Sequence, residues 1–200
     1  MAKSKQALFA DLLARVQHCK LCPRMQHRKK VLGPQNGSPD CPILFIAEAP
    51  GRLGADKFGI PLYGDQTGRN FEMLIASAGI KRELVFITNA VLCNPRTLDG
   101  NNDSPTLVEI RNCSQYLKET LEIIKPKFVV PLGAKALSAL NIINPHQVRL
   151  SEGTGKLFSW NGFKIYPLFH PGPRAFIRRT KAQQLEDYRT LASLLDKHHI

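Results

Sequence analysis

The sequence predicts an α/β fold in which helices cover both faces of a central, mainly parallel, four-stranded sheet. Three observations support this prediction. Short apolar runs of strand length alternate with longer segments whose apolar residues recur at helical spacing. The short runs are apolar at consecutive positions, which is typical of strands buried on both faces. No repeat or linker interrupts the pattern, so residues 1–200 are expected to form a single domain.

The first half of the chain supplies two predicted strands and two predicted helices. Leu8, Leu12 and Val16 lie on one face of an N-terminal helix of about four turns. The strands are predicted over residues 43–47 and 84–91, and the chain between them carries a Gly-rich loop and a helix. That helix has apolar residues at helical spacing from position 71 to 78, where a glycine follows.

The second half repeats the alternation. A helix passing through Tyr116 to Ile124 precedes a strand over 127–132, and Gly133 begins the next helix. The fourth strand spans 163–169, with a possible hairpin partner at 156–160. The last helix is marked by four apolar or aromatic residues on one face, which are Leu185, Tyr188, Ala192 and Leu195.

The charge of the chain favours an acidic partner. The formal net charge is +12, and nucleic acid is the commonest partner of strongly basic proteins. The alternative is a basic surface with no specific partner, which would give the same net charge. No apolar run is long enough to span a bilayer, and the N-terminus lacks a signal-peptide core. We therefore expect a cytoplasmic protein, monomeric and bound to no membrane, for which nucleic acid is a candidate partner.

Polar residues end three of the predicted strands. Glu48, Asn89 and His170 each follow an apolar run, and ligands of such sheets bind at the carboxyl edge. Each residue alone has an ordinary explanation, as a surface carboxylate, a turn amide and a core histidine. Together at one edge, they predict a pocket.

Four of the five cysteines form a second candidate site. Cys19 and Cys22 have C-x-x-C spacing at the end of a helix, Cys93 closes the second strand, and Cys113 lies in the next helix. Four thiolates suit either zinc or a 4Fe–4S cluster, and scattered buried thiols are the alternative. Cys41, just before the first strand, is predicted to be the unpaired one.

Several motifs in this order resemble family-4 uracil-DNA glycosylases. Residues 46–51 read Ile-Ala-Glu-Ala-Pro-Gly, close to the family's Gly-Glu-Ala-Pro-Gly, and residues 88–93 and 169–171 match its later motifs. The resemblance covers almost the whole chain. It implies a three-layer α/β/α fold and a pocket that takes a flipped-out uracil and hydrolyses its bond to the DNA sugar. It also implies a 4Fe–4S cluster held by four cysteines, namely Cys19, Cys22, Cys93 and Cys113.

The resemblance also implies roles for individual residues. Asn89 reads the Watson–Crick edge of uracil, and His170 donates to uracil O2 as negative charge develops there. Glu48 positions water or crowds a thymine methyl group. Tyr63 stacks on the base, or else is a core aromatic. Backbone N–H groups of the first motif contribute further substrate contacts, with Ala47, Ala49 and Gly51 as the candidates.

The segment after His170 is expected to contact DNA. Residues 172–174 form a loop in which Arg174 fills the gap left by the flipped base. Arg178, Arg179 and Lys181 are expected to hold phosphates, and a solvated helix start is the alternative explanation for them.

Three departures from the family pattern leave alternatives open. Arg52-Leu53-Gly54 stands where the family usually has acidic residues. The loop from Asn94 to Asp103 is long but contains no histidine that could trap DNA covalently, so ordinary turnover is predicted. Gly172-Pro173 slightly resembles the broader-specificity family 5. The competing hypotheses are such a glycosylase, a non-catalytic iron–sulfur DNA-binding protein and a zinc-bound structural or nuclease module.

Overall fold

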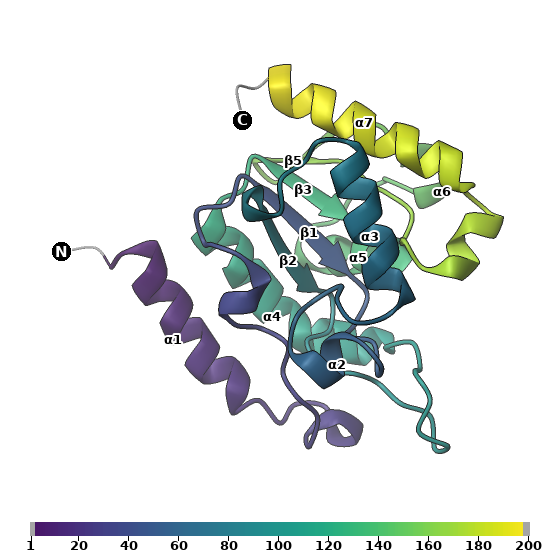
Figure 1. Cartoon of the computed structure of the whole chain (residues 1–200). Helices are drawn as coiled ribbons and strands as arrows, with labels where there is room; N and C mark the ends of the chain where they lie inside the picture. Colours follow the sequence, from purple (N-terminus) through teal and green to yellow (C-terminus); the bar gives the residue numbers. More distant parts are fainter. Residues whose placement is uncertain (1–2, 198–200) are drawn as a thin grey trace.

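The computed structural model describes residues 3–197 and contains one five-stranded sheet between two layers of helices (Figure 1). The strand order is β2-β1-β3-β5-β4, and β1 pairs in parallel with both β2 and β3. β5 continues the parallel arrangement, and β4 adds an antiparallel edge. The strands are β1 Ile43–Ala47, β2 Val85–Asn89, β3 Phe128–Pro131, β4 Phe158–Trp160 and β5 Phe163–Ile165.

The predicted three-layer, mainly parallel fold is therefore confirmed, with five strands in place of four. The additional strand is β4, the hairpin partner of β5. β5 is shorter than predicted, because after Ile165 the chain keeps only an isolated parallel bridge between Leu168 and Leu132. This departure from regular pairing leads directly into His170.

The central strand β1 shows why its sequence is continuously apolar. All five of its residues are buried. Ile43, Phe45 and Ala47 belong to the core on one face of the sheet, and Leu44 and Ile46 belong to the core on the other. A strand covered on both faces leaves no position for a polar side chain until it ends, at Glu48.

The helices divide between the two faces. Helices α1 (Lys5–Gln17), α4 (Leu107–Ile124) and α5 (Ala134–Ile143) cover one face, and α3 (Gln66–Ser77) and α7 (Lys181–Lys197) cover the other (Figure 1). Two further α-helices are short, α2 Ala55–Phe58 and α6 Leu150–Gly153, and the chain also forms short 3₁₀ turns. Within the described range, none of the helices combines the length and apolarity that crossing a bilayer requires.

Two helix caps place residues at the carboxyl edge of the sheet. Asp65 caps α3 by accepting a hydrogen bond from the Gly68 amide at 2.9 Å. Thr106 and Glu109 form a capping box at the start of α4, where each side chain accepts from the other residue's amide. Such caps satisfy backbone donors that a helix leaves unpaired, and they fix where each helix begins.

Candidate active site

A cavity of about 180 Å³ lies at the carboxyl edge of the sheet. Glu48, Asn89 and His170, which follow or end three different strands, all line it. The structure thus brings together the three residues that the sequence singled out. The rest of the wall comes from residues 49–67, a segment that includes α2 and the start of α3, and from the loop 94–103.

Asn89 is the most informative residue of this cavity. It ends β2, pairs in register with Ala47 of β1, and is only 3% exposed. Its side-chain nitrogen Nδ2 is buried without a hydrogen-bond partner in the described structure. An unpaired buried donor costs on the order of 1–3 kcal/mol. A ligand acceptor that enters the cavity would recover this free energy.

His170 is held in a defined orientation by its own loop. The Gly172 amide donates to Nδ1 at 3.0 Å, which places the proton of a neutral imidazole on Nε2. Burial lowers the pKa of His170, although the carboxylates of Glu48 and Asp65 oppose that shift. The ring is therefore neutral at pH 7 and offers an N–H donor from Nε2.

Gly172 is required by this arrangement, because a Cβ atom there would lie 2.8 Å from His170 Nδ1.

Three carboxylates surround the cavity. Glu48 is half-buried, and its Oε1 accepts a hydrogen bond from Ser104 Oγ at 2.8 Å. Asp65 and Asp103 also line the wall, although the sequence analysis did not single them out. The signal for Asp65 was the helix-capping pattern Asp-Gln-Thr-Gly before a helix. No local pattern pointed to Asp103, because a long loop brings it back to the cavity.

The glycines of the first loop allow Asp65 to approach. A Cβ atom on Gly51 or Gly54 would lie 2.9 Å or 2.5 Å from Asp65 Oδ2. The Gly-rich character of this loop therefore reflects close packing of backbone against a carboxylate at the site.

The two loops are joined by amide side chains. Asn94 Nδ2 donates to Pro50 O at 2.6 Å and to Asn102 Oδ1 at 3.0 Å. The Arg52 amide donates to the same Asn102 oxygen at 2.8 Å. These bonds hold Asn94 and Asn102 in the cavity wall, and no pattern in the sequence indicates this position.

Tyr63 does not lie in this wall. It is 50% exposed and packs edge-on against Phe58, with 5.7 Å between the ring centroids. The preceding Leu62 lines the cavity instead, with a φ of 49°. Of the three backbone candidates, Ala49 and Gly51 line the cavity, and Ala47 is buried at the end of β1.

The predicted DNA-binding arginines follow His170 on a 3₁₀ turn, Pro173–Ile177, and its end. Arg174 and Arg178 are exposed. Arg179 is partly buried and forms a bidentate ion pair with Asp187 of α7, with its Nε 2.9 Å from Oδ2. Its guanidinium thus fastens the loop to α7, which leaves Arg174 and Arg178 facing solvent.

Cys19, Cys22, Cys93 and Cys113 surround a separate cavity of about 20 Å³. Burial raises the pKa of the Cys93 thiol to about 11 and that of Cys113 to about 12. Cys41 lies elsewhere, with its Sγ 3.2 Å from Glu83 O. Between residues 3 and 197, no three histidine, cysteine or acidic side chains are arranged to hold one metal ion.

Comparison with known proteins assigns the family. Residues 34–192 match the model of the uracil DNA glycosylase superfamily. The chain is 33% identical over 183 residues to a type-4 uracil-DNA glycosylase of Thermotoga maritima, covering 91% of this chain and 89% of the relative. It is 34% identical to one of Saccharolobus solfataricus, with 95% and 88% covered. A type-5 uracil-DNA glycosylase of Pyrobaculum aerophilum is 27% identical, with 82% and 83% covered. This chain belongs to the uracil DNA glycosylase superfamily.

Proposed function

We propose that this protein hydrolyses the N-glycosidic bond of uracil in DNA and leaves an abasic site. The observation that carries the proposal is the unpaired, buried amide of Asn89 in a cavity that also holds the neutral donor His170. The family, and relatives named as type-4 uracil-DNA glycosylases, support the same reaction.

Asn89 selects the base by its hydrogen-bonding pattern. A side-chain amide donates from Nδ2 and accepts at Oδ1, and uracil presents an O4 acceptor beside an N3–H donor. Cytosine presents an amino donor and a bare N3 acceptor, so the same amide meets donor against donor. Because the wrong base leaves buried polar groups unpaired, normal cytosine is rejected.

His170 stabilises the leaving base. As the glycosidic bond breaks, negative charge grows on the uracil ring and its O2 oxygen. A neutral imidazole that donates from Nε2 stabilises this charge without first losing a proton to the base. The Gly172 contact on Nδ1 keeps the donor on the correct nitrogen.

The carboxylates act on the sugar side of the bond. Glycosidic cleavage passes through a transition state with cationic sugar character, which nearby negative charge stabilises. Glu48, fixed by Ser104, orients the attacking water, and Asp65 and Asp103 add to the negative potential of the same cavity.

The 3₁₀ turn after His170 contacts the DNA. The target base must leave the stack, since the glycosidic bond is out of reach inside a duplex. Arg174 fills the resulting gap and Arg178 binds a phosphate, as their exposure on one turn allows. The net charge of +12 strengthens binding to any DNA.

Cys19, Cys22, Cys93 and Cys113 hold a 4Fe–4S cluster in this proposal. Two features support it: the cavity that the four cysteines share and the relatives named as type-4 uracil-DNA glycosylases. In a cubane each thiolate binds its own iron, so the sulfurs need not converge on one point as they do around zinc. The cluster would cross-link the N-terminal segment to the segment that follows β2 and to α4.

The direct test is incubation with a uracil-containing oligonucleotide followed by alkaline cleavage. Strand breaks at the uracil position, absent with the matching thymine oligonucleotide, support the proposal. DNA binding without cleavage would favour the non-catalytic alternative. Comparable cleavage at hypoxanthine would favour the broader range suggested by the Gly172-Pro173 resemblance to family 5.

A further inference from the structure

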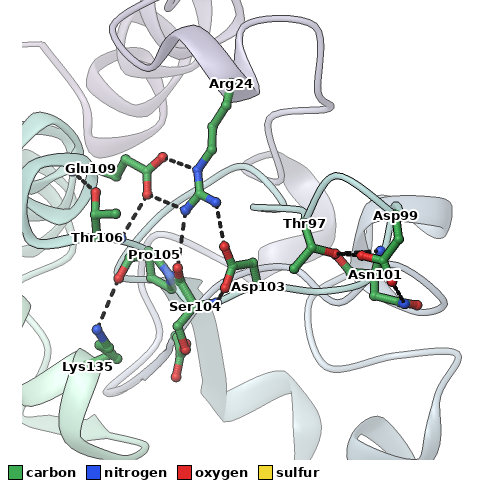
Figure 2. A network of polar contacts seen from close by, with 11 residues as sticks. Arg24, Thr97, Asp99, Asn101, Asp103, Ser104, Pro105, Thr106, Glu109 and Lys135 are labelled. Carbon is green, nitrogen blue, oxygen red and sulfur yellow. Dashed lines mark hydrogen bonds and ion pairs between the residues drawn. The ribbon is translucent and has the colours of Figure 1, made fainter.

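Arg24 is the centre of a polar network that the proposed mechanism does not use (Figure 2). It lies two residues after Cys22, in the turn Pro23–Met25. Its Nε and Nη2 donate to the two carboxylate oxygens of Glu109 at 2.6 and 2.8 Å. Its Nη1 donates to Asp103 Oδ2 at 2.6 Å, and Nη2 also reaches Ser104 O at 3.2 Å.

The acceptors of Arg24 belong to the segment between Cys93 and Cys113. Asp103 and Ser104 end the long loop that walls the cavity, and Glu109 lies in the first turn of α4. Lys135 of α5 adds a bond to Pro105 O at 3.0 Å (Figure 2). One guanidinium therefore holds the end of the loop against the helix that carries Cys113.

The network continues into the active site. Ser104, whose carbonyl accepts from Arg24, donates from its hydroxyl to Glu48 Oε1 at 2.8 Å. Asp103, the other loop acceptor, itself lines the cavity. A single residue, Ser104, therefore bonds to both the Arg24 guanidinium and the Glu48 carboxylate.

We infer that Arg24 is a positioning residue that fixes the end of the loop and, through Ser104, the orientation of Glu48. It thereby connects the cysteine-bearing N-terminal segment to the catalytic cavity. The inference rests on the proposed function for its activity readout. Its chemistry requires arginine, since a lysine ammonium is a point charge that does not reproduce the planar fork on Glu109 while also binding Asp103 and Ser104.

The choice of variants separates positioning from stability. Arg24→Ala would leave the Glu109 carboxylate, 9% exposed, without its cation, so misfolding would confuse the result. Arg24→Lys keeps the charge, and Ser104→Ala cuts the link to Glu48 without touching Arg24. Arg15→Lys is the matched control, because Arg15 also pairs with a glutamate of α4, Glu119, but far from the loop.

The experiment measures single-turnover uracil release, DNA affinity, visible absorbance and amide hydrogen exchange over residues 97–105. We expect Arg24→Lys and Ser104→Ala each to slow release roughly tenfold, as for a lost hydrogen bond to a charged group. DNA affinity and absorbance should stay unchanged, and the double variant should be no slower than the slower single variant. Exchange over 97–105 should rise in Arg24→Lys and stay at the wild-type level in Arg15→Lys.

Four results would overturn the inference. The first is a wild-type rate of uracil release in Arg24→Lys, and the second is a double variant whose loss of rate equals the product of the two single losses. The third is an equal loss of rate in Arg15→Lys. The fourth is a loss of visible absorbance in parallel with activity, which would show that Arg24 retains the cluster. If the wild-type protein releases no uracil, the proposed function fails by itself. Hydrogen exchange then decides, because unchanged exchange over 97–105 in Arg24→Lys would refute the positioning role.

Discussion

His170 illustrates how one side chain acquires its chemistry from its surroundings. Burial disfavours the imidazolium, and the Gly172 amide occupies Nδ1, so the ring offers a single neutral donor. His170→Ala removes this donor. We expect single-turnover release to fall about a hundredfold or more, roughly 3 kcal/mol in transition-state stabilisation, with DNA affinity nearly intact. A normal rate would remove His170 from the mechanism.

The pH dependence of release follows from the same residue. Because the pKa of His170 lies below its ordinary value near 6.5, the active neutral form persists as pH falls from 8 to about 6.5. We expect a flat rate over that range and a decline only at lower pH, as the ring gains a proton. Single-turnover rates measured from pH 8 to pH 5 test this. A rate that rises on acidification would show that the imidazolium is the active form.

Gly172 tests whether the orientation of the ring matters. A Cβ atom at this position would lie 2.8 Å from His170 Nδ1, so Gly172→Ala forces the ring or the loop to move. We expect a slower single-turnover rate with an unchanged midpoint of thermal unfolding. Gly162→Ala is a comparison in which no atom lies within 4 Å of the added carbon, although its φ of 81° makes it the more strained change. A slower rate in Gly162→Ala alone would contradict the orienting role.

Among the elements, the 3₁₀ turn Pro173–Ile177 and the residues just after it carry arginines of two kinds, exposed and ion-paired. Arg174 is exposed, and Arg179 is paired with Asp187. Arg174→Ala should reduce cleavage of duplex more than of single-stranded substrate, because only a duplex has a gap to fill. Arg179→Ala should lower thermal stability, since it leaves a nearly buried carboxylate unpaired. Equal losses on both substrates in Arg174→Ala would contradict the gap-filling role.

The elements also show what sequence could and could not predict. Burial on both faces made β1, β2 and β3 recognisable, and the polar residues that end the parallel strands marked the site. Sequence missed Asp103 and Asn102, because their positions depend on bonds that fold a long loop back onto residues 48–52. It named Tyr63 as a candidate for stacking on the base and did not single out Leu62, which lines the cavity with a φ of 49°.

At the scale of the whole molecule, the four-cysteine site joins segments far apart in sequence. Cys113→Ser should lose the yellow-brown colour, iron and sulfide of anaerobically purified protein, and should lose stability. Cys41→Ser is the matched control, because Cys41 is buried but bonds to Glu83 O, which a serine hydroxyl can also do. Iron and sulfide analysis with visible absorbance provides the measurement. Stoichiometric zinc without iron would refute the cluster.

The net charge predicts how binding responds to salt. If about four to six phosphates are contacted, the logarithm of DNA affinity should fall against the logarithm of salt concentration with a slope near −0.9 per phosphate. Titrations of a labelled duplex at several salt concentrations measure the slope. A slope near zero would contradict electrostatic binding to the phosphates of the DNA backbone.

Asn89 is proposed to read uracil in the cavity that it shares with His170. The most direct test is single-turnover cleavage of matched uracil and cytosine oligonucleotides by the wild-type protein and by Asn89→Asp. The wild-type protein should release uracil and leave cytosine. Asn89→Asp, which replaces the amide donor by an acceptor, should lose most uracil release and, if protonated in the pocket, gain weak cytosine release. Unchanged uracil release by Asn89→Asp would show that another residue reads the base.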